Sequence, residues 1–235
     1  LFSDDSEPHT KKKERFTFFC PQRMGIPKGT DILWEALQFC KSDFQILQVD
    51  WRDTGTDEEN STSLRLRENL PSQVKLIPMI KRKDIPSYYH SCDAVIGNLR
   101  IGSFEYVELE AVMCKKPVIS FTDKKIKISV DDKEIESPFI PDTNDPKDIA
   151  QVIDKLVVSD QFRQNIFKKE YDFVQNISDP KKAGEWWDSL FEKMIKENPS
   201  INRKSSGITV KLRMLSFLIS NRLYFRKIKN YSRNA

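Results

Sequence analysis

Arg23 and Lys28 flank the start of a predicted helix in this sequence of 235 residues. They follow an aromatic segment, residues 15–21, that predicts a buried strand, and the helix begins with Gly29 and Thr30, with Thr30 as its cap. Two cations beside the positive end of a helix dipole form a site suited to a diphosphate. A solvated turn is the alternative interpretation, since basic residues before helices are common.

A second predicted helix start lies near residue 103. Gly102 and Ser103, with Ser103 as the helix cap, are expected to bind an anion together with the backbone amides that follow. These amides belong to Phe104, Glu105, Tyr106 and Val107. The Glu105 side chain either supplies a carboxylate to the site or only stabilises the first helical turn.

Glu110 lies farther along the same helix, between Leu109 and Ala111, where the neighbouring residues are expected to be buried. Acids are seldom buried without partners, so a ligand-binding carboxylate is expected at this position. A solvent-facing helical glutamate is the alternative. Glu108, two residues earlier, is expected to be exposed.

Alternating strands and helices must position these residues. Apolar and β-branched segments predict strands at 15–21, 44–49, 74–80, 94–96, 117–121 and 138–140. Apolar periodicity predicts helices from 30 to 40, within 52–72, at 85–92, from 103 to 114, and at 146–157, 160–176 and 180–196. Crossovers of this length predict a doubly wound, Rossmann-like α/β fold, whose parallel sheet has helices on both faces and is followed by C-terminal helices. Ligand-binding loops are expected at the carboxyl ends of the strands, at 21–28, 80–86 and 97–103.

Three separated motifs resemble the donor-binding domain of group 1 (family 4) glycosyltransferases, and the resemblance covers roughly residues 15 to 195. They are Pro21-Gln-Arg23 with Lys28-Gly29, then Tyr88 with Asp93-Ala-Val-Ile, then Glu108-Leu-Glu110-Ala-Val-Met with Pro117-Val-Ile. The resemblance implies the two-domain glycosyltransferase B fold, in which the C-terminal domain binds a nucleotide sugar and the N-terminal domain binds the acceptor.

The resemblance also implies roles for individual residues. Arg23 and Lys28 match the basic pair that neutralises the donor diphosphate, and Glu110 matches the glutamate that holds the ribose. Ile80 and Lys81 match the loop that packs on the base. Gly102 stands where the family has its first glutamate, which contacts the transferred sugar, so this departure puts sugar choice and catalysis in doubt.

These assignments predict three parts of the chain. Residues 1–14 are a linker from a missing acceptor domain, 15–197 bind the nucleotide sugar, and 198–235 form a basic amphipathic tail. The predicted function is the donor-binding portion of a retaining glycosyltransferase, inactive as this chain alone. The alternative is a non-catalytic nucleotide-sugar-binding module or partner subunit. No metal or cofactor is expected.

Charge and composition predict the partners. Residues 200–235 hold nine basic residues and no acidic one, while the remainder holds 30 basic and 35 acidic residues. The segment 208–229 is expected to contact an anionic membrane or to pack on the missing domain, and the acidic body argues against nucleic acid. Four scattered cysteines predict reduced thiols and therefore a cytoplasmic protein. The basic segment 208–229 would then contact the inner face of the membrane. Trp186 and Trp187 are expected in the core.

Overall fold

The computed structural model describes residues 15–130, 133–178, 180–197, 212–213, 215–217 and 219. It divides the chain into two compact units, Leu1–Asp179 and Pro180–Ala235. The predicted linker at 1–14 and most of the predicted tail at 198–235 lie outside the described residues.

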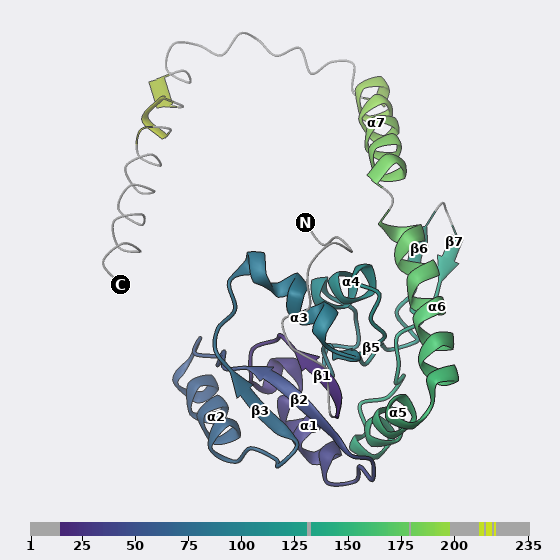
Figure 1. The fold of residues 1–235 in the computed structure, drawn as a ribbon. Coiled ribbons are helices and arrows are strands. Elements are labelled where there is room, and N and C mark those ends of the chain that lie inside the picture. Colours follow the sequence, from purple (N-terminus) through teal and green to yellow (C-terminus); the bar gives the residue numbers. More distant parts are fainter. Residues whose placement is uncertain are drawn as a thin grey trace. The chain divides into compact units, whose positions relative to one another are not determined.

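The first unit is built on a five-stranded sheet in which every neighbouring pair of strands is parallel (Figure 1). Its strands are β1 (Phe16–Cys20), β2 (Phe44–Val49), β3 (Val74–Ile77), β4 (Ala94–Ile96) and β5 (Val118–Ile119). They lie in the order β3-β2-β1-β4-β5, which confirms the predicted doubly wound fold. The order reverses between β1 and β4, and ligands bind α/β sheets in the crevice at such a switch point.

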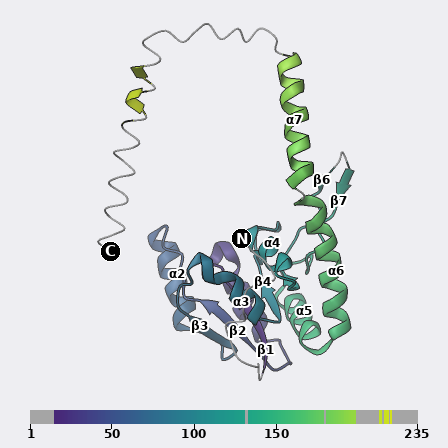
Figure 2. The ribbon, with the colours of Figure 1, turned by 45° about the horizontal axis from the view of Figure 1, so that its top comes forward.

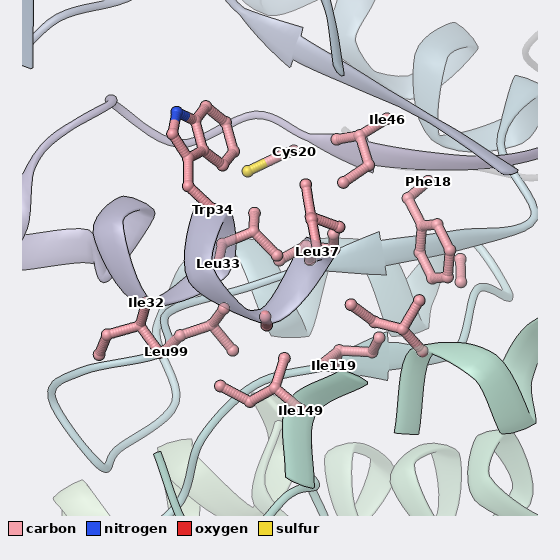
Figure 3. Close-up of a cluster of buried hydrophobic side chains, with 14 of the residues drawn as sticks. Phe18, Cys20, Ile32, Leu33, Trp34, Leu37, Ile46, Leu99, Ile119 and Ile149 are labelled. Carbon is pink, nitrogen blue, oxygen red and sulfur yellow. The ribbon is translucent and has the colours of Figure 1, made fainter. Parts of the chain in front are cut away.

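Helices cover both faces of this sheet (Figures 1 and 2). They are α1 (Thr30–Leu37), α2 (Asp57–Glu68), α3 (Ile85–Ser91), α4 (Tyr106–Met113), α5 (Pro146–Val158) and α6 (Asp160–Ile177), with short 3₁₀ turns η1 (Ile26–Lys28) and η2 (Arg82–Asp84). Phe18 and Phe19 are both fully buried and belong to separate core clusters, because successive strand residues point to opposite faces. Figure 3 shows the Phe18 cluster, in which Leu33 of α1 and Ile149 of α5 meet the sheet.

Helix α6 packs against both α4 and α5. Its fully buried Glu170 accepts a hydrogen bond from the backbone N–H of Val118 at 3.0 Å. Val118 belongs to β5, the last strand of the sheet order. The carboxyl group therefore satisfies a backbone donor of an edge strand that would otherwise be buried without a partner.

The boundaries of several elements differ from the predictions. Strand β3 ends at Ile77 rather than residue 80, because Pro78 has no N–H with which to continue the ladder. Thr30 is not the cap of α1: Gly29 holds that position in the left-handed conformation, at φ 73°. The Thr30 hydroxyl instead accepts a hydrogen bond from the N–H of Gly25 at 3.0 Å. The predicted strand at 138–140 is a single bridge between Ile140 and Ile119.

The prediction missed a small antiparallel hairpin. It consists of β6 (Ile128–Val130) and β7 (Lys133–Ile135). The sequence carries a strand signal that the prediction did not use, since Ile126, Ile128 and Val130 alternate with Lys127 and Ser129.

The second unit contains α7 (Pro180–Glu197). The prediction that Trp186 and Trp187 are core residues is wrong, because 58% and 51% of their surfaces are exposed. Phe191 stacks on Trp187 with ring centroids 5.7 Å apart and is exposed as well. The described residues include no helix with the length and apolarity needed to cross a membrane.

Candidate functional site

A cavity of about 280 Å³ opens beside the carboxyl end of β1. It is lined by Pro21, Gln22, Arg23, Lys28, Trp51, Glu105, Tyr106 and Val107. These residues come from the loops after β1 and β2 and from the start of α4, which follows β4. The cavity therefore lies where the strand order reverses, the expected ligand position for this fold.

Arg23 reaches the cavity from the loop after β1. Its guanidinium lies 3.2 Å from a carboxylate oxygen of Asp53, whose side chain is 5% exposed. The same guanidinium lies over the ring of Trp51, 5.6 Å from the ring centroid. These two contacts hold the cation in place while 40% of its side chain stays exposed to a ligand.

Lys28 ends the turn η1 on the other side of the same loop. Its Nζ donates to both carboxylate oxygens of Glu105, each at 2.6 Å. Glu105 also accepts a hydrogen bond from the side-chain amide of Asn98 at 3.1 Å. Partial burial raises the pKa of Glu105, but the bonds from Lys28 and Asn98 outweigh that effect and leave the pKa below its usual range. Glu105 is therefore ionised at neutral pH.

Glu105, not Ser103, caps α4, so the predicted position of this cap is wrong. The Glu105 carboxylate accepts from the backbone N–H of Glu108, and the Glu108 carboxylate accepts from the backbone N–H of Glu105 at 2.8 Å. This reciprocal pair is a capping box. The expected anion site at the helix start thus already contains a carboxylate supplied by the protein itself.

Glu108 is fully buried, so the prediction that it is exposed is wrong. Besides the N–H of Glu105, it accepts hydrogen bonds from the backbone N–H of Asn98 at 2.9 Å and from the Ser120 hydroxyl at 2.8 Å. A buried carboxylate is tolerated when hydrogen bonds satisfy its oxygens in this way. Glu108 thereby ties the loop after β4 and the segment after β5 to the start of α4, and so it positions Glu105.

Gly102, Ser103 and Phe104 do not line the cavity. Gly102 has φ 78°, in the left-handed region, and a Cβ there would meet Asp123 and Phe121 at 3.2 Å. The Phe104 ring packs edge-on against Phe173, with centroids 5.5 Å apart. The segment before α4 is therefore shaped by a glycine turn and anchored in the core.

Glu110 lies one turn beyond the cavity on α4 and does not line it. Its carboxylate accepts from Arg82 and from the hydroxyl of the buried Tyr89, each at 3.2 Å. Burial raises the pKa of Glu110, and the bonds from Arg82 and Tyr89 offset this only in part. Ile80 and Lys81, the predicted base neighbours, precede Arg82 and lie outside the cavity lining. The structure therefore places Glu110 beside the loop after β3, to which the predicted base-binding residues belong.

The sequence prediction missed Trp51, Asp53 and Asn98. Trp51 lines the cavity, Asp53 pairs with Arg23, and Asn98 holds Glu105. Trp51 lies two residues after the end of β2, so the rule that ligands bind beyond the carboxyl ends of strands could have indicated it. The pairing partners carry no such local signal, because they depend on long-range contacts.

This arrangement brings two cations to one cavity next to an exposed aromatic ring. Arg23 and Lys28 can donate charge-assisted hydrogen bonds to phosphate oxygens. Trp51, 45% exposed, offers an apolar surface beside them. The site is thus suited to an anion joined to a flat or apolar group.

Comparison with known proteins gives a family and a fold. The model of the family described as "Glycosyl transferases group 1" matches residues 2–173. A search of curated proteins found no match. Among solved structures, the chain is similar to Anabaena Alr3699/HepE in complex with UDP and glucose, at 20% identity and a TM-score of 0.56, covering 74% of this chain and 48% of that one.

Two further structures share this fold. Sucrose-phosphate synthase from Thermosynechococcus elongatus is 18% identical with a TM-score of 0.61, over 78% of this chain and 46% of that chain. The C-terminal domain of a group 1 glycosyl transferase (LpcC) from Francisella tularensis is 22% identical with a TM-score of 0.51, over 68% of this chain and 84% of that one. The chain spans about half the length of the first two structures. Because the family model matches most of its residues, the chain belongs to the group 1 glycosyltransferases.

Proposed function

We propose that this chain is the donor-binding portion of a glycosyltransferase that moves a sugar from a nucleoside-diphosphate sugar to an acceptor, with retention at the anomeric carbon. The observation that carries the proposal is the meeting of Arg23 and Lys28 at one cavity at the switch point of the sheet. Similar structures contain UDP and glucose, or UDP-glucose, which supports a ligand of this class.

In this proposal, each part of the site has a task. Arg23 and Lys28 bind the diphosphate and stabilise the charge that develops on the leaving nucleotide. Glu110 accepts hydrogen bonds from the ribose hydroxyls, and Ile80 and Lys81 contact the base through their backbone. The proposal includes no metal ion or other cofactor, because Arg23 and Lys28 can themselves donate hydrogen bonds to the diphosphate oxygens.

The proposal places the acceptor site on an N-terminal domain joined to this one. The chain covers 48% of the Alr3699/HepE structure and 46% of the sucrose-phosphate synthase structure, which supports a second half of similar size in the complete enzyme. This chain alone then binds donor without transferring sugar.

A second candidate is a binding module that holds a nucleotide sugar but does not transfer it. The turn at Gly102 favours this candidate, because no carboxylate stands at that position and the left-handed backbone disfavours one. Sugar transfer by this chain joined to an acceptor domain supports the enzyme, whereas donor binding without transfer supports the module.

The C-terminal region is proposed to contact an anionic membrane at its cytoplasmic face. Nine basic residues without an acid in 200–235, and the exposed apolar side chains Trp186, Trp187 and Phe191 of α7, support this partner. Sedimentation with vesicles tests it: binding to vesicles rich in phosphatidylserine, lost at high salt and on deletion of 198–235, supports it. Equal binding after that deletion contradicts it.

Calorimetric titration with UDP, GDP and their sugar conjugates tests the donor-binding proposal. We expect one base to be preferred and Glu110→Ala to weaken binding about tenfold or more, since a bidentate charge-assisted contact is lost. Glu35→Ala, an exposed glutamate on α1, is the matched control and should leave binding unchanged. Absence of binding by all of these nucleotides at millimolar concentration contradicts the proposal.

A further inference from the structure

The charges of the cavity are balanced before any ligand enters. Arg23 is paired with Asp53 at 3.2 Å, and Lys28 is paired with Glu105 at 2.6 Å. A diphosphate therefore does not enter a field of two unpaired cations. Each cation must interact with the ligand while its own carboxylate stays close.

Of the two carboxylates, only Glu105 lines the cavity. Its side chain is 31% exposed, whereas that of Asp53 is 5% exposed. A ligand in the cavity therefore contacts Glu105 directly, whereas Asp53 affects it only by partly neutralising the charge of Arg23.

Glu105 cannot easily turn away from the cavity. Its carboxylate accepts from the N–H of Glu108 in the capping box and from the amide of Asn98 at 3.1 Å. Glu108 in turn is fixed by hydrogen bonds from Asn98 and Ser120. The negative charge therefore stays beside Lys28 when a ligand binds.

Lys28 can donate hydrogen bonds to Glu105 and to a ligand at the same time. An ammonium group has three N–H donors, and two are directed to the oxygens of Glu105. The third is available for a phosphate oxygen. A ligand hydroxyl can then donate to Glu105 in place of one of the two Lys28 bonds.

We propose that Glu105 is a specificity-determining residue that makes this site favour a nucleotide sugar over the free nucleoside diphosphate. The inference rests on the proposed function, because it concerns the same cavity. Sugar hydroxyls are hydrogen-bond donors to the Glu105 carboxylate. A terminal phosphate at the same place offers only acceptor oxygens and repels the carboxylate, so the product is released more readily than the donor is.

The protonation of the ligand gives a test that needs no variant. The terminal phosphate of a free nucleoside diphosphate takes up a proton at a pKa of about 6, as other phosphate monoesters do, whereas the phosphates of a nucleotide sugar have no group that titrates there. Protonation removes one negative charge and supplies one O–H donor. A site with a fixed carboxylate should therefore bind UDP more tightly at pH 5.5 than at pH 7.5. A site with two cations and no carboxylate should bind UDP more weakly at pH 5.5 than at pH 7.5.

The experiment measures the Kd of UDP and of UDP-glucose for the unmutated chain at both pH values, then for Glu105→Gln at pH 7.5. We expect UDP binding to tighten as the pH falls and UDP-glucose binding to change less than twofold. Glu105→Gln should tighten UDP binding about tenfold, the effect of removing one like charge a few ångströms away, and should not tighten UDP-glucose binding. Glu136→Gln, which removes another lysine-paired glutamate, is the matched control.

The outcomes separate this inference from the function on which it rests. If UDP binding weakens as the pH falls, or if Glu105→Gln changes the two affinities equally, the role of Glu105 is overturned and donor binding stands. If neither ligand binds, and GDP and GDP-mannose do not bind either, the proposed function is overturned as well. The pH measurement decides the question even if Glu105→Gln does not fold.

Discussion

Replacement of Glu108 by alanine is expected to destabilise the whole first unit, although Glu108 lies outside the cavity lining. The substitution removes the acceptor of two backbone N–H groups, those of Asn98 and Glu105, and of the Ser120 hydroxyl. The hydroxyl can rotate to another acceptor, since it also donates to the carbonyl of Asn98 at 3.0 Å. The N–H of Asn98 is buried and that of Glu105 is partly buried. A buried N–H group without an acceptor costs about 1–3 kcal/mol and a partly buried one costs less, so the free energy of unfolding should fall by about 2–4 kcal/mol.

Urea denaturation followed by circular dichroism measures this loss. Glu35→Ala removes an exposed glutamate from α1 and should change the free energy of unfolding by less than about 0.5 kcal/mol. The loss for Glu108→Gln should lie between those for Glu35→Ala and Glu108→Ala. The glutamine amide keeps one acceptor oxygen, but its NH₂ group faces another hydrogen-bond donor. A loss below about 1 kcal/mol for Glu108→Ala would refute the inference that Glu108 holds the start of α4 in place.

Two further perturbations follow from single buried positions. Burial raises the pKa of Glu170 well above its usual range, so in the folded state it keeps a proton that the unfolded state loses above about pH 4.3. The contribution of Glu170 to the free energy of unfolding therefore falls as the pH rises, by up to about 1.4 kcal/mol per pH unit. The stability of Glu170→Gln relative to the unmutated chain should accordingly increase from pH 4.5 to pH 7.5. A difference in stability that stays constant in thermal melts across that range contradicts this. Gly102→Glu should not restore the family carboxylate. The left-handed backbone and the 3.2 Å contacts of a Cβ with Asp123 and Phe121 should lower the free energy of unfolding by about 1–3 kcal/mol. A variant as stable in urea as the unmutated chain would show that the turn accommodates a side chain.

The sheet and its helices were predictable because their signals are local. Strands such as 44–49 are apolar runs bounded by polar segments, and the long crossovers between them allow only parallel pairing. The meeting of Arg23 and Lys28 at the switch point followed from the same rule. Of the three loops predicted to bind ligand, only 21–28 lines the cavity, whereas 80–86 and 97–103 do not.

The inner structure of the cavity was not predictable, because it depends on contacts between distant residues. Glu108 can be buried only because Gly97 lacks a side chain: a Cβ there would lie 2.1 Å from the Glu108 carboxylate. The capping role of Glu105 required Glu108 and Asn98 to be in place, whereas Ser103 has the residue type that usually caps a helix. The exposure of Trp186 depends on what α7 contacts, which its own sequence does not specify.

The measurement that tests the central claim most directly compares nucleotide binding after two matched pairs of substitutions. The first pair, Arg23→Ala with Lys28→Ala, removes both cations of the cavity. The second, Arg15→Ala with Lys147→Ala, removes one arginine paired with Asp43 and one lysine packed on Phe39, both outside the cavity lining. We predict that calorimetry will show the Kd of the preferred nucleotide sugar rising by a hundredfold or more, about 2.7 kcal/mol, for the first pair and less than threefold for the second. Equal affinities for the two double variants would contradict the account, because the donor diphosphate would then bind elsewhere.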